Sequence, residues 1–333
     1  MPCRLTRPHS RRPVVPANPG PPEHRRSFRA ALVAAIAPLV VLTSSGVPPV
    51  PVPVDPSPVA AAWPPSPPPS PSLASPRKTN LPRPSYRKPL TRALSRYLDD
   101  VPGQLAVAIR DLSTGRSFSY NRGLRTATAS IVKVNIVVAL LLQAQRRHRR
   151  LTGWERRAAA RAIKVSDNAA ASALWAAIGG AFGLAAANSK LGLRSTRPGP
   201  GGAWGSTTTS AADQLRLLTA LTSADSPLSA QHRRYVLRLM GDVAPEQSWG
   251  VSAAGRKGAD VALKNGWLPR ERDGGRWTVN SIGRVRDRGH TYLIAVISRR
   301  HGSMGAGVKA VEHVSALMAE ALSGAASKAA AKR

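Results

Sequence analysis

A serine and a lysine three residues apart, Ser130 and Lys133, could act as a nucleophile and its base. On a helix, residues three apart lie on one face, so the lysine amine could take the hydroxyl proton as the serine attacks a carbonyl carbon. A serine at a helix start also gains from the positive end of the helix dipole, which stabilises negative charge on the attacked oxygen. The same spacing recurs after Ser75 and Ser85, in a proline-rich segment that offers no preorganised partners. The spacing is therefore weak evidence when taken alone.

Two further short motifs contain groups that could assist such a nucleophile. Ser-Asp-Asn at residues 166–168 is predicted to join two helices, where a hydroxyl and an amide can project into a cleft. The same residue types are more often helix N-caps. Lys-Asn-Gly-Trp at residues 264–267 precedes an alternating run, which places its lysine on an edge strand facing the cleft. An Asn-Gly turn with a solvent-facing lysine is the equal alternative.

The elements around these motifs are predicted from hydrophobic periodicity and from turn and cap residues. They are a helix over 91–98 with Thr91 near its N-cap, hairpin strands through 105–109 and 118–120, a buried helix over 131–142 entered at Ser130, a helix opened by the capping box Thr152 and Glu155, more helices to about 239, strands over 277–285 and 291–298, and a last helix over 306–322. This order indicates an α+β fold, with an antiparallel sheet flanked by helices and an all-α block inserted.

The start of the chain is predicted to direct export rather than to fold. Arg25 and Arg26 precede a short apolar stretch over residues 30–42, as in a signal peptide, and the paired arginines are typical of the twin-arginine route. A retained membrane anchor is the alternative. The proline-rich part that follows favours polyproline II. We therefore expect an export segment at 1–45, a disordered linker at 46–86, a folded domain at 87–325 and a flexible basic tail at 326–333.

The formal net charge of +32 would steer the protein toward anionic partners. A non-enzymatic or degenerate basic envelope protein that binds cell-wall polymer or another polyanion is therefore the competing interpretation. Basic residues are spread along the folded part, aromatic residues make up 5%, and no nucleic-acid motif is recognised, so no specific nucleic acid partner is expected. The histidines lack the spacing of metal ligands, and the single cysteine, Cys3, excludes an intramolecular disulfide.

Together and in this order, the three motifs resemble the Ser-x-x-Lys, Ser-Asp-Asn and Lys-Thr-Gly set of class A β-lactamases and penicillin-binding proteins. The stretches at 204–213 and 249–251 resemble the exit of that family's omega loop and the segment before its lysine strand. The resemblance extends from Arg92 to Leu322. It implies an exported serine hydrolase, active as a monomer without cofactors, whose substrate is a small molecule or a cell-wall peptide.

The resemblance also implies roles for the matched catalytic residues. Ser130 would be the nucleophile, acylated by β-lactams or by amides of the peptidoglycan type. Lys133 would be its base or proton acceptor, and Ser166 would pass a proton to the leaving nitrogen.

Four residues are matched to substrate binding. Asn168 would hold the substrate amide, and Lys264 would bind a substrate carboxylate or support proton transfer through the neighbouring serine. Gly266 would let the strand backbone approach the ligand closely. The backbone amide of Trp267 would form an oxyanion hole with that of Ser130.

The sequence departs from the family pattern in the residues needed for deacylation, the hydrolysis of the acyl-enzyme. Class A enzymes place a glutamate in the omega loop to activate the hydrolytic water. No aspartate or glutamate occurs between Asp167 and Asp213 here, and Asn265 replaces the usual threonine. We therefore expect acylation to survive while deacylation is slow or uses another base.

Overall fold

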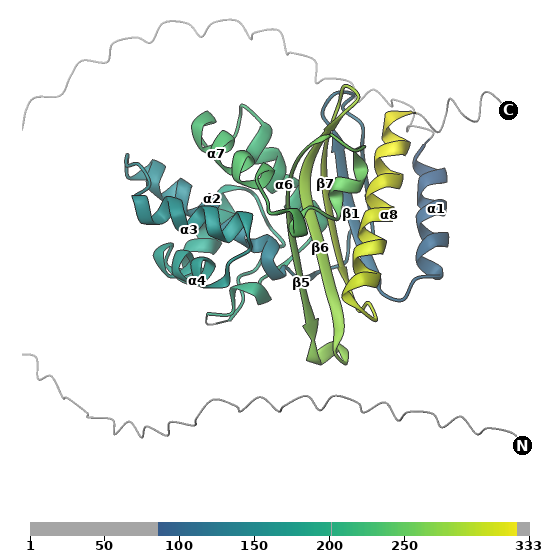
Figure 1. Cartoon of the computed structure of the whole chain (residues 1–333), viewed down its shortest axis with the longest axis horizontal. Coiled ribbons are helices and arrows are strands. Elements are labelled where there is room, and N and C mark those ends of the chain that lie inside the picture. The colour runs from purple at the N-terminus through teal and green to yellow at the C-terminus, as the bar shows by residue number, and fades with distance from the viewer. Residues whose placement is uncertain (1–85, 201, 325–333) are drawn as a thin grey trace, which may run out of the picture. The chain divides into compact units, whose positions relative to one another are not determined.

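Strands from both ends of the folded region form one five-stranded antiparallel sheet (Figure 1). The computed structural model describes residues 86–200 and 202–324, so the predicted export segment, the linker before Tyr86 and the basic tail lie outside the described residues. The sheet order is β2-β1-β7-β6-β5, with every neighbouring pair antiparallel. Its strands are β1 (Gln104–Asp111), β2 (Ser117–Tyr120), β5 (Asp260–Arg270), β6 (Arg276–Asp287) and β7 (His290–Arg299). The predicted α+β class is confirmed.

Helices cover both faces of this sheet, as Figure 1 shows. One face carries α8 (Met304–Ser323), with α1 (Arg87–Asp99) packed beside it. The other face carries the predicted helical block, which also holds the short pair β3 (Thr126–Ala127) and β4 (Thr208–Thr209). Its helices are α2 (Val132–Arg146), α3 (Gly153–Lys164), α4 (Asn168–Ala177), α5 (Gly180–Lys190), α6 (Ala211–Thr222) and α7 (Ala230–Gly241). The 3-10 turns are η1 (Ala129–Ile131), η2 (Trp204–Ser206), η3 (Pro245–Gln247), η4 (Val251–Ala254) and η5 (Glu271–Asp273).

Two apolar clusters form because successive side chains of a strand point to opposite faces. On β1, Ala106 and Ala108 join the cluster under the helical block, whereas Val107 and Ile109 join the cluster under α8. The small alanines face the helices that approach the sheet closely. The same alternation determines which side chains of β5 can reach a site on the helical side.

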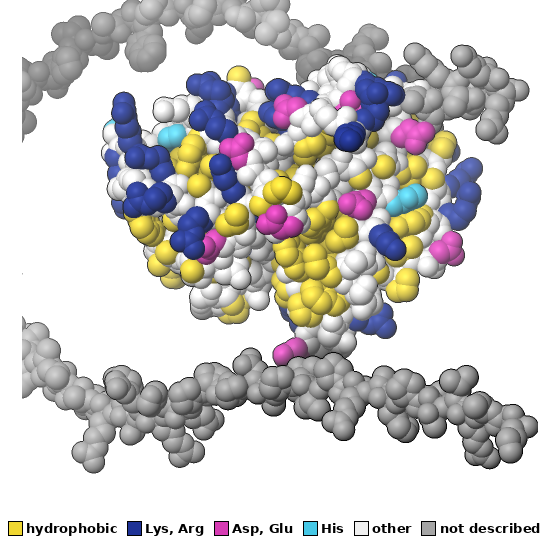
Figure 2. Space-filling view, viewed as in Figure 1, with side chains coloured by type: hydrophobic (Ala, Val, Ile, Leu, Met, Phe, Trp, Pro, Cys, Tyr) yellow, Lys and Arg dark blue, Asp and Glu magenta, His cyan; other side chains and the backbone are white. Residues whose placement is uncertain are grey.

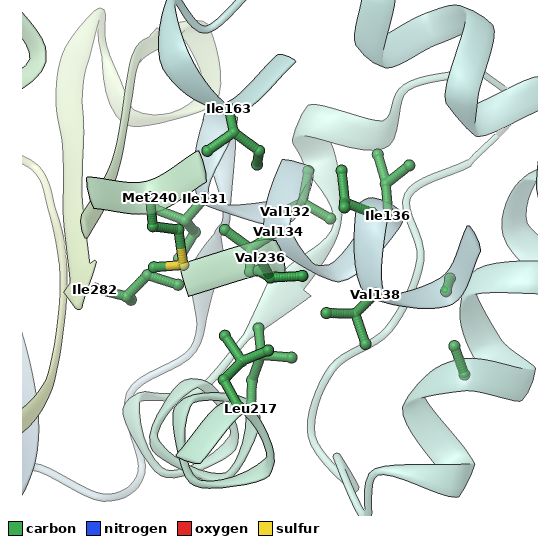
Figure 3. Packing of buried hydrophobic residues seen from close by; sticks show 14 of the residues in the cluster. Ile131, Val132, Val134, Ile136, Val138, Ile163, Leu217, Val236, Met240 and Ile282 are labelled. Carbon is green, nitrogen blue, oxygen red and sulfur yellow. The ribbon is translucent and has the colours of Figure 1, made fainter. Parts of the chain in front are cut away.

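Helix α2 lies at the centre of the helical block and is buried on nearly all sides. The stretch 129–146 is apolar and long enough to cross a membrane, but it is mostly buried inside the protein, as expected of a core helix. Figure 3 shows Ile131, just before α2, together with Met240 of α7 and Ile282 of β6. This packing holds the start of α2 between the sheet and the helices.

The predicted helix start was right for α3 and wrong for α1. The capping box is present: the Glu155 N–H donates to Thr152 Oγ1 at 3.1 Å, and the Thr152 N–H donates to Glu155 Oε2 at 2.8 Å. The N-cap predicted near Thr91 is wrong, because α1 already begins at Arg87. Thr91 lies within the helix and donates its hydroxyl to the Arg87 carbonyl at 2.9 Å, the local bond that lets threonine sit inside a helix.

Candidate active site

Ser130 lies in the 3-10 turn η1, directly before α2, and its side chain is half-buried. The preceding Ala129 has φ 48°, a left-handed conformation that is uncommon outside glycine. Such a conformation persists only where surrounding contacts hold it, and it is typical of functional turns. One holding contact is the Thr128 N–H, which donates to the Thr207 carbonyl at 2.7 Å.

A buried asparagine of β6 ties the nucleophile turn to the sheet. Asn280 Nδ2 donates to the carbonyls of Ala127 at 2.9 Å and Thr128 at 3.0 Å, and its Oδ1 accepts the Ser298 N–H at 3.0 Å. The side chain is fully buried. Sequence analysis missed Asn280, although a polar residue in the apolar alternation of 277–285 was a signal that could have identified it.

Gly266 lies directly against the backbone of the nucleophile turn. A Cβ added there would lie 2.6 Å from Ser130 N, 2.7 Å from Ile131 N and 2.8 Å from Thr128 O. Real Cβ atoms do not approach backbone atoms so closely. Strand β5 can therefore reach the Ser130 amide only because residue 266 has no side chain.

Lys133 is fully buried and is held by the turn between α3 and α4. Its Nζ donates to Ser166 O at 2.5 Å, Ser166 Oγ at 3.0 Å and Asn168 Oδ1 at 2.8 Å. Burial lowers the pKa of Lys133 to about 8, although the charge of Asp167 opposes that shift. A lysine with this pKa can exist as a neutral amine near physiological pH and so can accept a proton.

Lys264 reaches the same hydroxyl from the edge strand β5. Its Nζ donates to Ser166 Oγ at 3.1 Å and to Asn265 O at 2.9 Å. Burial, together with the positive charge of Lys133, lowers the pKa of Lys264 to about 7. Lys264 lies on an edge strand as predicted, and its Asn-Gly neighbours are inside that strand, so the alternative of a turn is wrong.

The Ser-Asp-Asn motif is both a helix cap and a supplier of polar groups. Asp167 is the N-cap of α4: its Oδ1 accepts the Ala170 N–H at 2.9 Å, and it pairs with Arg161. The flanking Ser166, with φ 56°, and the exposed Asn168 turn their oxygens to the buried lysine of α2. The helix-cap interpretation therefore applies to Asp167, and the interpretation as polar groups of the site applies to Ser166 and Asn168.

Trp204 of η2 is a neighbour of Lys133 that sequence analysis did not identify. The Lys133 Nζ lies 5.0 Å from the centre of its ring, within cation–π range. The indole N–H donates to Ser172 Oγ of α4 at 3.0 Å, which fixes the ring. In the sequence, Trp204 begins the threonine-rich stretch 204–209, but this position does not indicate a contact with Lys133.

Trp267 and Asn265 turn their side chains away from this site. Both belong to the alternate set of β5 residues, and Trp267 packs with the α8-side cluster, 5.6 Å from the ring of Trp249. Asn265 Nδ2 donates to the carbonyls of Gln247 at 2.8 Å and Trp249 at 3.0 Å. What Trp267 can offer the nucleophile is therefore its backbone amide, next to Gly266.

The site thus brings the Ser166 hydroxyl together with two lysine amines from separate segments, and Ser130 lies in η1, directly before the helix that carries Lys133. Within residues 86–200 and 202–324, no group of three or more His, Cys, Asp or Glu side chains could hold a metal ion. A hydroxyl beside an amine of lowered pKa can be activated as a nucleophile, and the Ser166 hydroxyl can pass protons between two lysines. This arrangement is suited to acyl transfer.

Comparison with known proteins gives a consistent result. The model of a family described as "Beta-lactamase enzyme family" matches residues 89–153 and 155–322. Proteins named "Putative lipoprotein LppW" from Mycobacterium tuberculosis and Mycobacterium bovis are 29% identical over 170 residues, which are 49% of this chain and 54% of theirs. The match thus spans about half the length of these curated relatives.

Two solved structures show the same fold. An ancestral class A β-lactamase aligns with a TM-score of 0.61 at 22% identity, covering 70% of this chain and 99% of that one. The TLA-1 extended-spectrum β-lactamase aligns with a TM-score of 0.63 at 16% identity, covering 71% of this chain and 99% of that one.

Proposed function

The chain belongs to the beta-lactamase enzyme family, and we propose that it is an exported serine hydrolase acylated at Ser130 by β-lactams or by amides of the peptidoglycan type. The observation that best supports this proposal is the convergence of Lys133 and Lys264 on one hydroxyl, Ser166 Oγ, at 3.0 and 3.1 Å. Burying two lysine amines this close together disfavours their charged forms, and such lowered pKa values are typical of sites that carry out chemistry.

Acylation uses the hydroxyls and amines in sequence. Neutral Lys133 takes the Ser130 hydroxyl proton as Oγ bonds to the carbonyl carbon, and the amides of Ser130 and Trp267 stabilise the oxyanion. The carbon–nitrogen bond then breaks as Ser166 gives its proton to the leaving nitrogen and regains one from a lysine. Asn168 holds the substrate amide, and charged Lys264 attracts a substrate carboxylate.

Deacylation is proposed to be slow. Hydrolysis needs a base for the attacking water. The carboxylate of the Ser-Asp-Asn motif, Asp167, is already paired with Arg161 and accepts the Ala170 N–H. The protein would then resemble a penicillin-binding protein in its kinetics more than an efficient β-lactam-degrading enzyme.

The proposal includes export to the cell envelope by the twin-arginine route. It also includes a monomeric state. The lipoprotein name of the mycobacterial relatives supports an envelope location. Analytical ultracentrifugation of the purified chain would test the monomer, and an export reporter fused to residues 1–45 would test the route.

Intact mass spectrometry after mixing the full chain with a fluorescent penicillin tests the proposed chemistry. We expect a lasting adduct of one penicillin per chain, absent in Ser130→Ala. Rapid turnover of a chromogenic cephalosporin without an adduct would contradict slow deacylation. No adduct and no turnover on any β-lactam or peptidoglycan fragment would instead favour the degenerate, non-enzymatic envelope protein suggested by the net charge.

A further inference from the structure

A cleft of about 790 Å³ opens between the edge strand β2 and helix α6, at the opposite edge of the sheet from the Lys264 strand. It is separate from the candidate active site, which lies at β5. Its floor is apolar, and its polar lining consists mainly of arginine, serine and threonine. The polar lining residues are Arg87, Arg110, Ser117, Ser119, Arg122, Arg216, Thr219, Ser223, Asp225 and Ser226. Among the described residues that line it, four are arginines and one is acidic.

The arginines are partly held in place by neighbouring oxygens. Arg122 Nε donates to Ser119 Oγ at 2.6 Å, and Arg87 Nη2 donates to the Ser117 carbonyl at 2.8 Å. A guanidinium has five N–H donors, so each of these groups keeps further donors for a ligand. Oriented guanidinium groups bind phosphate through two parallel hydrogen bonds. The cleft is thus prepared for an anion rather than merely close to exposed charge.

Basic side chains also lie outside this cleft. On the face shown in Figure 2, lysine and arginine side chains are scattered over the helical block and the adjoining surface. In the cleft, arginines from the start of α1, from β1, from the loop after β2 and from α6 line one hollow, and the α6 arginine, Arg216, is paired with Asp213.

We propose that this cleft binds a flexible polymer of phosphate groups that are linked by small aliphatic units. The phosphates would meet the arginines, and the aliphatic links would lie on partly exposed apolar residues of α6 such as Leu215 and Ala220. Single-stranded nucleic acid fits less well because it needs aromatic side chains for base stacking. Phe118, the aromatic residue among the described lining residues, is only 5% exposed.

Fluorescence anisotropy with end-labelled poly(glycerol phosphate) tests this proposal. The double variant Arg110→Ser with Arg122→Ser should weaken binding by about tenfold or more and reduce its salt dependence. The matched control Arg234→Ser with Arg238→Ser removes the same charge from exposed positions on α7 and should weaken binding by less than about twofold. Acylation at the active site should be unchanged in both.

Two results would overturn the proposal. Equal weakening in the two double variants would show that the polymer binds the diffuse charge of the surface. Equally tight binding of an oligo(dT) strand through the same two arginines would show a nucleic-acid site instead. Neither result depends on whether the protein reacts with β-lactams.

A separate observation concerns Trp204 and rests on the proposed acylation of Ser130. The segment of this tryptophan lies against the nucleophile turn: Thr128 Oγ1 donates to the Gly205 carbonyl at 3.5 Å, and the Thr128 N–H donates to Thr207 O at 2.7 Å. Its ring lies 5.0 Å from the Lys133 amine and is held by Ser172. An indole ring, which has no carboxylate, thus lies beside the Lys133 amine.

We infer that Trp204 lengthens the lifetime of the acyl-enzyme by denying water a base at this place. In hydrolysis, the water oxygen bonds to the acyl carbon and a base takes one water proton. The bond from the acyl carbon to Ser130 Oγ then breaks, and that proton is returned to Oγ. Trp204 cannot accept the proton, because the indole N–H is a donor only.

The change Trp204→Glu should therefore shorten the lifetime of the adduct by about 100-fold or more relative to Trp204→Gln. The glutamine matches the size of the glutamate without its base, and Trp204→Phe should keep the lifetime long. The readout is decay of the adduct by intact mass after excess penicillin is removed. Equal lifetimes for Glu and Gln would overturn this inference alone, whereas no adduct in the unchanged chain would overturn the proposed acylation.

Discussion

Gly266→Ala is the substitution whose effect follows most directly from the structure. The new Cβ would lie 2.6, 2.7 and 2.8 Å from three backbone atoms of the nucleophile turn, whereas ordinary contact begins at 3.4 Å. All three neighbours are backbone, so none can rotate away. Strand β5 and η1 must therefore separate by roughly 0.6 to 0.8 Å to restore ordinary contacts.

The separation affects chemistry more than stability. Overpacking of this kind costs about 1–3 kcal/mol of unfolding free energy. A misplacement of about 1 Å at a reacting group lowers the rate by about 100-fold. Because the Ser130 amide and the Trp267 amide lie on the two sides of this contact, we expect acylation to slow by about 100-fold while the chain stays folded at 25 °C.

The assay is the rate of adduct formation with a fluorescent penicillin, measured beside a denaturant unfolding curve for each variant. Gly305→Ala is the matched control, since a Cβ there meets nothing within 4 Å and lies in α8, far from η1 in the chain. That variant should acylate normally and be slightly more stable, because alanine favours helix. Acylation of Gly266→Ala within about threefold of the unchanged chain would refute the reasoning.

Four further outcomes are expected. The acylation rate should rise with pH through about 8 as Lys133 becomes neutral. Asp167→Asn keeps an N-cap residue but removes the negative charge that raises the Lys133 pKa. The rise in acylation rate should therefore move to lower pH, and a move to higher pH would contradict this. Asn280→Ala should lose about 2 kcal/mol or more in urea unfolding and slow acylation, because it leaves buried backbone groups unpaired. Thr152→Ala should cost about 1 kcal/mol in the same unfolding measurement with acylation unchanged, since it removes only a distant helix cap.

The sequence alone was enough to predict the fold class and the groups that converge on Ser166. Alternation along 277–285 and 291–298 predicted strands that the structure confirms as β6 and β7. These features are local, since a helix cap or a strand pattern depends on neighbours within a few residues. The order of the three short motifs added the family resemblance.

Packing decided what those local patterns left open. Thr91 was predicted to cap α1 but lies inside it, because the helix begins at Arg87 and already buries Leu90. The pleat of β5 turns Lys264 to the helical block and Trp267 to the α8 side, a choice that depends on which layers cover each face.

The tertiary structure alone placed the remaining parts of the site and the basic cleft. Asn280 reaches carbonyls more than 150 residues earlier in the chain, and Trp204 comes to Lys133 from a separate loop. Such contacts depend on strand register and on how helices pack, and neither leaves a periodic trace in the sequence. The residue types around Ser130 were therefore enough to propose its chemistry, whereas the contacts that hold its turn in place and that bring Trp204 to Lys133 were determined only by the fold.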